Sequence, residues 1–186
     1  MELTREKALE LLHRHVKGEG MIRHCLASEA VMRALAAKLS QNTEVWGLAG
    51  LLHDLDVEIT QADPFVHGQQ TAGLLDGYDV DPEMLDAIAM HNEMSSGAER
   101  NTMFQHALAA GETITGLIFA TTYVYPDKKL SSVKPASVVK RMKEKAFAAS
   151  VKRENILECE KIGIPLPEFA ELCIRAMLPV SEELGL

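Results

Sequence analysis

The chain has 186 residues, of which 47% are hydrophobic, 25% are charged and 5% are aromatic, and its formal net charge is −8. This length and apolar content predict one domain with a substantial core, and the 12 glycines and 7 prolines are too few for a fibrous or disordered class. The negative charge argues against indiscriminate binding to nucleic acid or anionic lipid. Ala, Leu, Met, Glu and Lys are abundant, which favours helices. We therefore expect an all-α protein with almost no sheet.

In the first half of the chain, apolar residues recur at spacings of three and four, which predicts a series of helices. Thr4, Asn42 or Thr43, Asp63 and Asp81 are the expected N-caps, because short polar side chains accept hydrogen bonds from the first turn. The aspartates at 63 and 81 are each followed by proline, which suits the first helical position. The expected helices cover residues 4–16, about 21–39, 43–54, 63–76 and 84–91.

The second half is predicted to be helical as well, beginning with a long helix from Thr102 to about Tyr123. Two basic or mixed helices are expected near residues 135–146 and 153–162. A last helix is expected from Pro167 to about residue 184, with a kink at the proline in position 179. No internal repeat or linker is visible. We expect a single domain with a core at about residues 20–125, on which a basic C-terminal helical part at about residues 126–186 packs.

Basic residues are concentrated between Lys128 and Arg153, where nine of them stand against one acid, so this stretch carries a net charge of +8. Two interpretations are open. The stretch is either a solvated helix face that balances an acidic body, or a surface that attracts an anionic substrate.

The three cysteines, Cys25, Cys159 and Cys173, form no CxxC motif, so neither a disulfide framework nor a zinc ribbon is indicated. A reducing compartment fits this pattern. The N-terminal residues MELTREKALE contain no apolar secretory segment, and the longest apolar stretch, residues 114–124, is too short to span a bilayer. The expected location is therefore the cytoplasm, with no membrane partner.

One histidine lies on each of the expected second to fifth helices: His24, His53, His67 and His91. Asp54 follows the second of them, at the end of the apolar run GLAGLL. Four helices that each direct one imidazole into a shared interior form a bundle-type metal site. Imidazole and carboxylate ligands suit Zn, Fe, Mn, Ni or Co. Adjacent residues on a helix point about 100° apart, so His53 and Asp54 reach one cation only where the helix ends at a cavity.

With this ordered set of residues, the sequence resembles the HD-domain superfamily of metal-dependent phosphohydrolases over about residues 20–125. The stretches LLHDLDVE, DPFVHGQQTAGLL, AIAMHNE and VYPDKKLSSVKPASVVKRMKEKAFAASVKRENI are similar to a bacterial and archaeal HD subgroup of about this length. The resemblance implies an all-α HD bundle with additional C-terminal helices. It also implies a metal site formed by His24, His53, Asp54 and a later carboxylate. Two further histidines, matched by His67 and His91, imply a second metal, with Asp54 bridging the two ions.

One position departs from the superfamily pattern. The late ligand is usually Asp, but the matching residue here is Glu112. A glutamate reaches one methylene further, so three outcomes are open: it binds the metal directly, binds it through water, or leaves one metal weakly held.

The remaining candidates for chemistry flank these motifs. Asp56 and Glu58 are expected either to orient the attacking water or to be solvated turn residues. Arg23, Lys128 and Lys129 are expected either to bind the substrate phosphate or to lie on the surface.

The predicted function is that of a metal-dependent phosphohydrolase, a phosphomonoesterase or phosphodiesterase. Water activated by one or two divalent transition metal ions (Mn, Fe, Co, Ni or Zn) attacks phosphorus in the substrate, which is either nucleotide-like or another small phosphorylated molecule. Nucleic acid is not expected as a partner, and an oligomer is compatible with the sequence. Two alternatives are a di-iron oxygenase on the same scaffold and a non-catalytic module that senses a nucleotide.

Overall fold

The computed structural model describes all 186 residues, and its regular elements are helices, with one isolated β-bridge between Glu2 and Asp79. The all-α prediction is therefore confirmed. The elements of the first half are α1 (Arg5–His15), α2 (Glu19–Lys38), α3 (Thr43–Leu52), α4 (Thr71–Leu74), α5 (Pro82–Met90) and α6 (Glu93–Ser96). Those of the second half are α7 (Met103–Tyr123), η1 (Leu130–Ser132), α8 (Pro135–Arg141), α9 (Arg153–Leu157), η2 (Glu158–Ile162), α10 (Leu166–Met177), η3 (Leu178–Val180) and α11 (Ser181–Leu184).

Several helices begin at the polar residues that the sequence indicated. The Asn42 side chain accepts hydrogen bonds from two backbone N–H groups of α3, and Asp81 caps α5, with Pro82 at its first position. Thr102 and Gln105 form a capping box at the start of α7. Each cap satisfies N–H groups that have no partner inside the helix.

The expectation of a helix over residues 63–76 is wrong for most of its length, because only the four residues of α4 are helical there. The buried carboxylate of Asp56 accepts hydrogen bonds from the backbone N–H groups of Gly68 and Gln70. Gly68 also has a φ of +92°, outside the helical region. The chain from His53 to Gln70 is therefore a series of turns.

The C-terminal helices are shorter than expected. The helix predicted over residues 135–146 ends with α8 at Arg141, and the one predicted over residues 153–162 consists of α9 followed by the 3₁₀ turn η2. The last predicted helix is interrupted by η3, which contains Pro179. Proline lacks the N–H group that would continue the helical ladder there.

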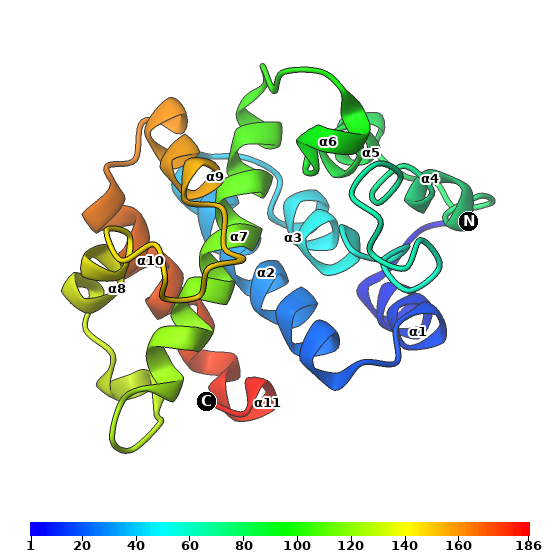
Figure 1. Cartoon of the computed structure of the whole chain (residues 1–186). Helices are drawn as coiled ribbons and strands as arrows, with labels where there is room; N and C mark the ends of the chain where they lie inside the picture. Colours follow the sequence, from blue (N-terminus) through cyan, green and yellow to red (C-terminus); the bar gives the residue numbers. More distant parts are fainter.

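Helices α2, α3 and α7 form the centre of the molecule, and α8, α9 and α10 contact α7 on the side away from α1 (Figure 1). A single cluster of 42 buried residues includes residues from both the N-terminal and the C-terminal helices. None of the helices is both long enough and apolar enough to cross a membrane.

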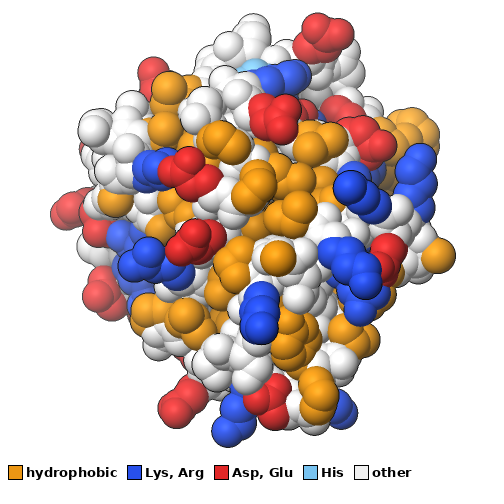
Figure 2. All heavy atoms as spheres, turned by 90° about the vertical axis from the view of Figure 1, so that its left-hand side faces the viewer, with side chains coloured by type: hydrophobic (Ala, Val, Ile, Leu, Met, Phe, Trp, Pro, Cys, Tyr) orange, Lys and Arg blue, Asp and Glu red, His pale blue; other side chains and the backbone are white.

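Lysine and arginine side chains are dispersed among apolar and acidic ones on the face formed by the C-terminal helices (Figure 2). They do not merge into one basic surface on this face. The arrangement there favours the solvated-face interpretation of the basic stretch 128–153.

Candidate metal centre

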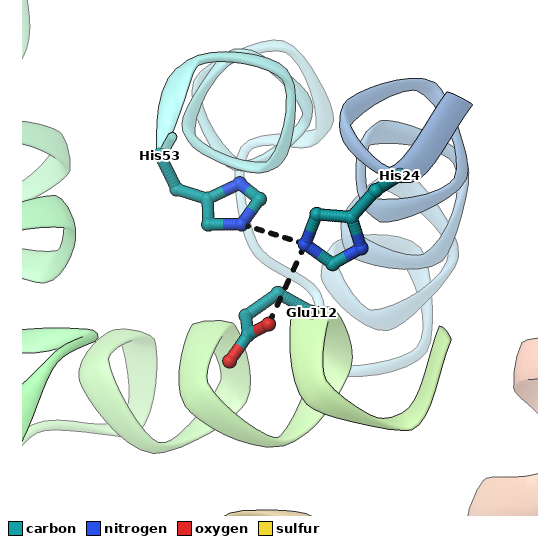
Figure 3. Close-up of side chains that lie close together, drawn as sticks. All are labelled: His24, His53 and Glu112. Atoms are coloured by element: carbon teal, nitrogen blue, oxygen red, sulfur yellow. Dashed lines mark hydrogen bonds and ion pairs between the residues drawn. The ribbon is translucent and has the colours of Figure 1, made fainter. Parts of the chain in front are cut away.

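Three helices bring His24, His53 and Glu112 together (Figure 3). His24 lies on α2, His53 directly follows α3, and Glu112 lies on α7. The Nε2 atoms of the two histidines are 3.1 Å apart, and Glu112 Oε2 is 3.6 Å from His24 Nε2. Helices α2 and α3 approach closely at Gly50, where an added Cβ would lie 2.5 Å from the backbone oxygen of Ser28. Glycine at this position therefore permits the contact that pairs the two imidazoles.

His67 and His91 form a second pair, with Nε2 atoms 3.2 Å apart. Asp54 lies between the two pairs. Its Oδ2 is 3.5 Å from His24 Nε2 and 3.4 Å from His53 Nε2, whereas its Oδ1 is 2.9 Å from His67 Nε2 and 3.5 Å from His91 Nε2. Each oxygen of this one carboxylate therefore faces one histidine pair.

The tautomers of the histidines follow from their Nδ1 partners. Nδ1 of His53 is 2.9 Å from the carbonyl oxygen of Gly50, and Nδ1 of His91 is 2.6 Å from that of Ile88. A carbonyl only accepts, so both Nδ1 atoms carry the hydrogen. In the neutral imidazole, Nε2 then presents a lone pair.

The other two histidines follow the same rule. His67 Nδ1 is 2.8 Å from the Asp56 carboxylate. His24 Nδ1 is 2.8 Å from Thr115 Oγ1, and that hydroxyl donates its own hydrogen to the backbone oxygen of Glu112. In their neutral forms, all four imidazoles thus direct lone pairs at one another and at Asp54.

Burial and charge act differently on the ionisable groups of this cluster. Burial lowers the pKa of His53 to about 3, which keeps its imidazole neutral. Burial alone would raise the pKa of Asp54, but the surrounding imidazoles outweigh it and hold this pKa well below its ordinary value. Burial also raises the pKa of Glu112. The cluster therefore has an ionised carboxylate at its centre.

His67 carries a hydrogen on both ring nitrogens in the metal-free chain. Burial opposes its charged form, but the carboxylates of Asp54 and Asp56 outweigh burial and raise its pKa to about 10. His67 Nε2 donates its hydrogen to Asp54 Oδ1, 2.9 Å away. Converging nitrogen and carboxylate donors of this kind are the ligands of divalent transition metals, so the residues present fit such ions.

Groups of three residues lie close enough to hold an ion, with ligand atoms within 4.8 Å of one another: His24, His53 and Glu112 form one group, and Asp54, His67 and His91 form another. Cys25, His53 and Asp54 form a third group that meets the same distance limit. Burial raises the pKa of the Cys25 thiol well above the ordinary value, and its neutral side chain is part of the core.

Asp56 does not line the cleft beside the histidines. Its carboxylate is fully buried and accepts hydrogen bonds from His67 Nδ1 and from the N–H groups of Gly68 and Gln70. Neither expectation for Asp56, an acid that orients water or a solvated residue, agrees with this position. Its carboxylate orients the imidazole of His67 instead.

Glu58 is exposed and is not among the residues that line the cleft beside His24, His67 and His91, which is described below. This position disagrees with the expected catalytic role. Its Oε1 accepts hydrogen bonds from the N–H groups of Lys17 and Gly18, ahead of α2. This is the turn role that the sequence left open.

The three expected phosphate-binding residues also lie away from the cleft. Arg23 lies 3.8 Å from Glu19 in an ion pair on α2, and Lys128 and Lys129 follow the far end of α7. Between Glu112 and Tyr123 that helix rises about 16 Å, at roughly 1.5 Å per residue. The surface alternative applies to all three.

A cleft of about 290 Å³ opens onto the candidate metal ligands. Its opposite wall comes from the segment around α9 and includes Ser150, Val151, Lys152 and Asn155. None of these four residues was a candidate from the sequence alone. In the sequence, Lys152 is one of nine basic residues between Lys128 and Arg153. It is distinguished from the others because the folded chain places it in the lining of the cleft.

Comparison with known proteins agrees with this geometry. A model of the HD domain matches residues 21–144. A region of 106 residues is 28% identical to ribonuclease Y 2 of Levilactobacillus brevis and covers 57% of this chain but 19% of that protein. No solved structure matches the chain significantly. The HD superfamily is one of metal-dependent phosphohydrolases. Because the family model covers more than half of the chain, the protein belongs to the HD domain family.

Proposed function

We propose that this protein is a metal-dependent phosphohydrolase that acts on a small phosphorylated molecule. One observation carries the proposal: each oxygen of the Asp54 carboxylate faces its own pair of imidazoles, at distances of 2.9–3.5 Å. In this proposal His24, His53 and Glu112 would hold one divalent cation, His67 and His91 would hold a second, and Asp54 would offer one carboxylate oxygen to each. Glu112 takes the place of the usual aspartate.

Such cations, when bound, lower the pKa of water and offset the charge that develops on a phosphoryl oxygen. The chain itself fixes the geometry that this chemistry needs. Thr115 and the carbonyl groups of Gly50 and Ile88 hold the imidazoles in one tautomer, and Asp56 does the same for His67. Orienting partners of this kind also raise the basicity of the ligands.

The test is turnover by the purified protein loaded separately with Mn, Co, Ni, Zn or Fe. An aryl phosphate, sugar phosphates, nucleotides and a short RNA form the substrate panel, and released phosphate or cleaved product is measured. RNA is included because the relative from Levilactobacillus brevis is named a ribonuclease. Metal-dependent hydrolysis of a phosphate ester supports the proposal, and absence of turnover with every metal contradicts it.

Oxygen consumption and thermal stability, measured on the same metal-loaded protein, separate the two alternative functions. A di-iron oxygenase on this donor set would require iron and consume oxygen, whereas the proposed hydrolase works anaerobically with redox-inert zinc. A sensing module would be stabilised by a nucleotide that it never consumes.

A further inference from the structure

We propose that the substrate is a sugar or polyol monophosphate rather than a nucleotide, and that Lys152, Glu93 and Asn155 bind its hydroxyl groups. This inference rests on the proposed function and narrows it. The phosphate would lie at the candidate metal ligands, and the hydroxylated carbon chain would extend toward the opposite wall of the cleft.

The size and lining of the cleft support a small polar substrate. Its volume of about 290 Å³ lies at the lower limit of ligand pockets, which span about 300–1,000 Å³. Val151 is the one hydrophobic residue in the lining, and no Phe, Tyr or Trp contributes to it. Nucleobases are bound through stacking on aromatic or apolar faces. This cleft offers them no such platform.

The wall opposite the histidines instead presents hydrogen-bonding groups. Lys152 forms an ion pair with Glu93 across the cleft, and both side chains are partly exposed. An ammonium group beside a carboxylate supplies a donor and an acceptor side by side, which is what a hydroxyl group requires. Aliphatic hydroxyls would therefore find both partners at this pair.

Asn155 adds a fixed donor. Arg100 Nη2 donates to Asn155 Oδ1 over 2.9 Å, and a guanidinium only donates, so the oxygen of the amide must face it. The Nδ2 group of this mostly buried residue has no hydrogen-bond partner within the chain. An acceptor oxygen from a ligand in the cleft would satisfy it.

The segment that carries this wall is held in place by the partly buried guanidinium of Arg153. Arg153 donates to five backbone carbonyl groups between Arg141 and Val151. Five bonds from one side chain fix a stretch that has no regular secondary structure after α8. The hydroxyl-binding groups are thus positioned before a substrate arrives, which lowers the entropic cost of binding.

Ribose 5-phosphate and AMP form a matched substrate pair, because they share the ribose and the phosphate and differ in the base. We expect kcat/KM of the metal-loaded protein to be at least about tenfold higher for ribose 5-phosphate. Higher kcat/KM for AMP would overturn the inference, as would hydrolysis of an aryl phosphate without hydrolysis of any sugar or polyol phosphate. Loss of all turnover, aryl phosphate included, would instead indicate that the proposed function itself fails.

Substitution of a residue in the opposite wall tests the same inference through ligand binding, with no need for turnover. We expect Lys152→Met to weaken binding of a non-hydrolysable phosphonate analogue of ribose 5-phosphate by about tenfold, measured by calorimetry. Lys143→Met is the matched control, because Lys143 is an exposed lysine of the same stretch, outside the cleft and without an ion pair. Equal affinities of the two variants for the analogue would overturn the role of Lys152.

Discussion

Two buried polar clusters lie next to each other in this protein, and they balance their charges in opposite ways. Around Asp54, imidazoles and carboxylates converge without a lysine or arginine in direct contact. Around Arg100, a guanidinium meets acceptors at every side. Its side chain is 6% exposed and pairs with Glu158 at 2.6 Å.

The Arg100 cluster is complete within the chain. The guanidinium also donates to the backbone oxygens of Met90 and His91, at 3.0 and 3.2 Å, and His106 Nδ1 is 2.7 Å from Glu158 Oε2. These contacts link the backbone at His91 to the segment that forms the opposite wall of the cleft. Arg100 is therefore a structural ion-pair centre behind the candidate site.

The difference between the two clusters shows how a buried ligand-binding cluster can be told from a structural one. Buried ionic groups are costly unless charge and hydrogen bonds compensate them. The chain supplies that compensation at Arg100, whereas at Asp54 the protonated imidazole of His67 supplies part of it. Cations from solution would supply the rest, so the two clusters should respond differently to substitution and to chelators.

The largest effect is expected for Asp54→Ala. Removal of the carboxylate shared by both histidine pairs should abolish metal binding and lower activity by about a thousandfold or more, because cations contribute several kcal/mol to the transition state. Metal content is measured by elemental analysis and activity with an aryl phosphate. EDTA should lower the Tm of the wild type and leave that of the variant unchanged. Full metal content in the variant would refute the assignment of Asp54.

Arg100→Met should destabilise the fold by about 3 kcal/mol, because it removes the guanidinium that compensates the mostly buried carboxylate of Glu158. In contrast to Asp54→Ala, the loss should be the same with and without bound metal. Urea unfolding of both forms measures it. A variant as stable as the wild type would show that this cluster is not a structural centre.

A smaller effect is expected for Asp56→Asn. The variant keeps the shape of the side chain but weakens the hold on His67 Nδ1, so metal affinity should fall by about 10–100-fold. Calorimetric titration with Zn or Mn measures it. Glu58→Gln is the control, since Glu58 is an exposed acid that lies outside the cleft. Unchanged affinity in Asp56→Asn would contradict a role in orienting His67.

Glu112→Gln should have the smallest effect in this series. The amide retains one neutral oxygen donor toward the cation at His24 and His53, so affinity for that cation should fall by about tenfold, while the cation at His67 and His91 stays bound. The two ions should then dissociate at different chelator concentrations. Their simultaneous loss would show that Glu112 does not belong to one ion alone.

Much of the helical framework could be predicted from local signals, such as the caps at Thr4, Asn42 and Asp81. The stretch 63–76 could not, because a carboxylate in another segment, that of Asp56, takes the N–H groups that a helix would need. Gly68 fits that turn for a second reason: an added Cβ would lie 3.0 Å from the His91 ring. Local sequence patterns do not indicate that a carboxylate from another segment will compete for these N–H groups.

His24, His53, Asp54, His67 and His91 could be selected as candidate ligands from residue type and chain order, whereas Glu112 was implied by the resemblance to the HD superfamily. The opposite wall of the cleft could not be, since it depends on how the chain returns after α8. Lys128 and Lys129 were plausible from proximity in sequence to Glu112, but the length of α7 separates them from the site. Lys152 and Asn155, much later in the chain, lie at the cleft instead.

Counting the metal ions bound to the purified wild-type protein tests the central claim most directly. After loading with Mn, Co, Ni or Zn and removal of free metal, elemental analysis should find two ions per chain in the wild type. The count should be zero in Asp54→Ala, with the helical circular dichroism spectrum unchanged. A folded wild-type chain that retains no transition metal would contradict the account.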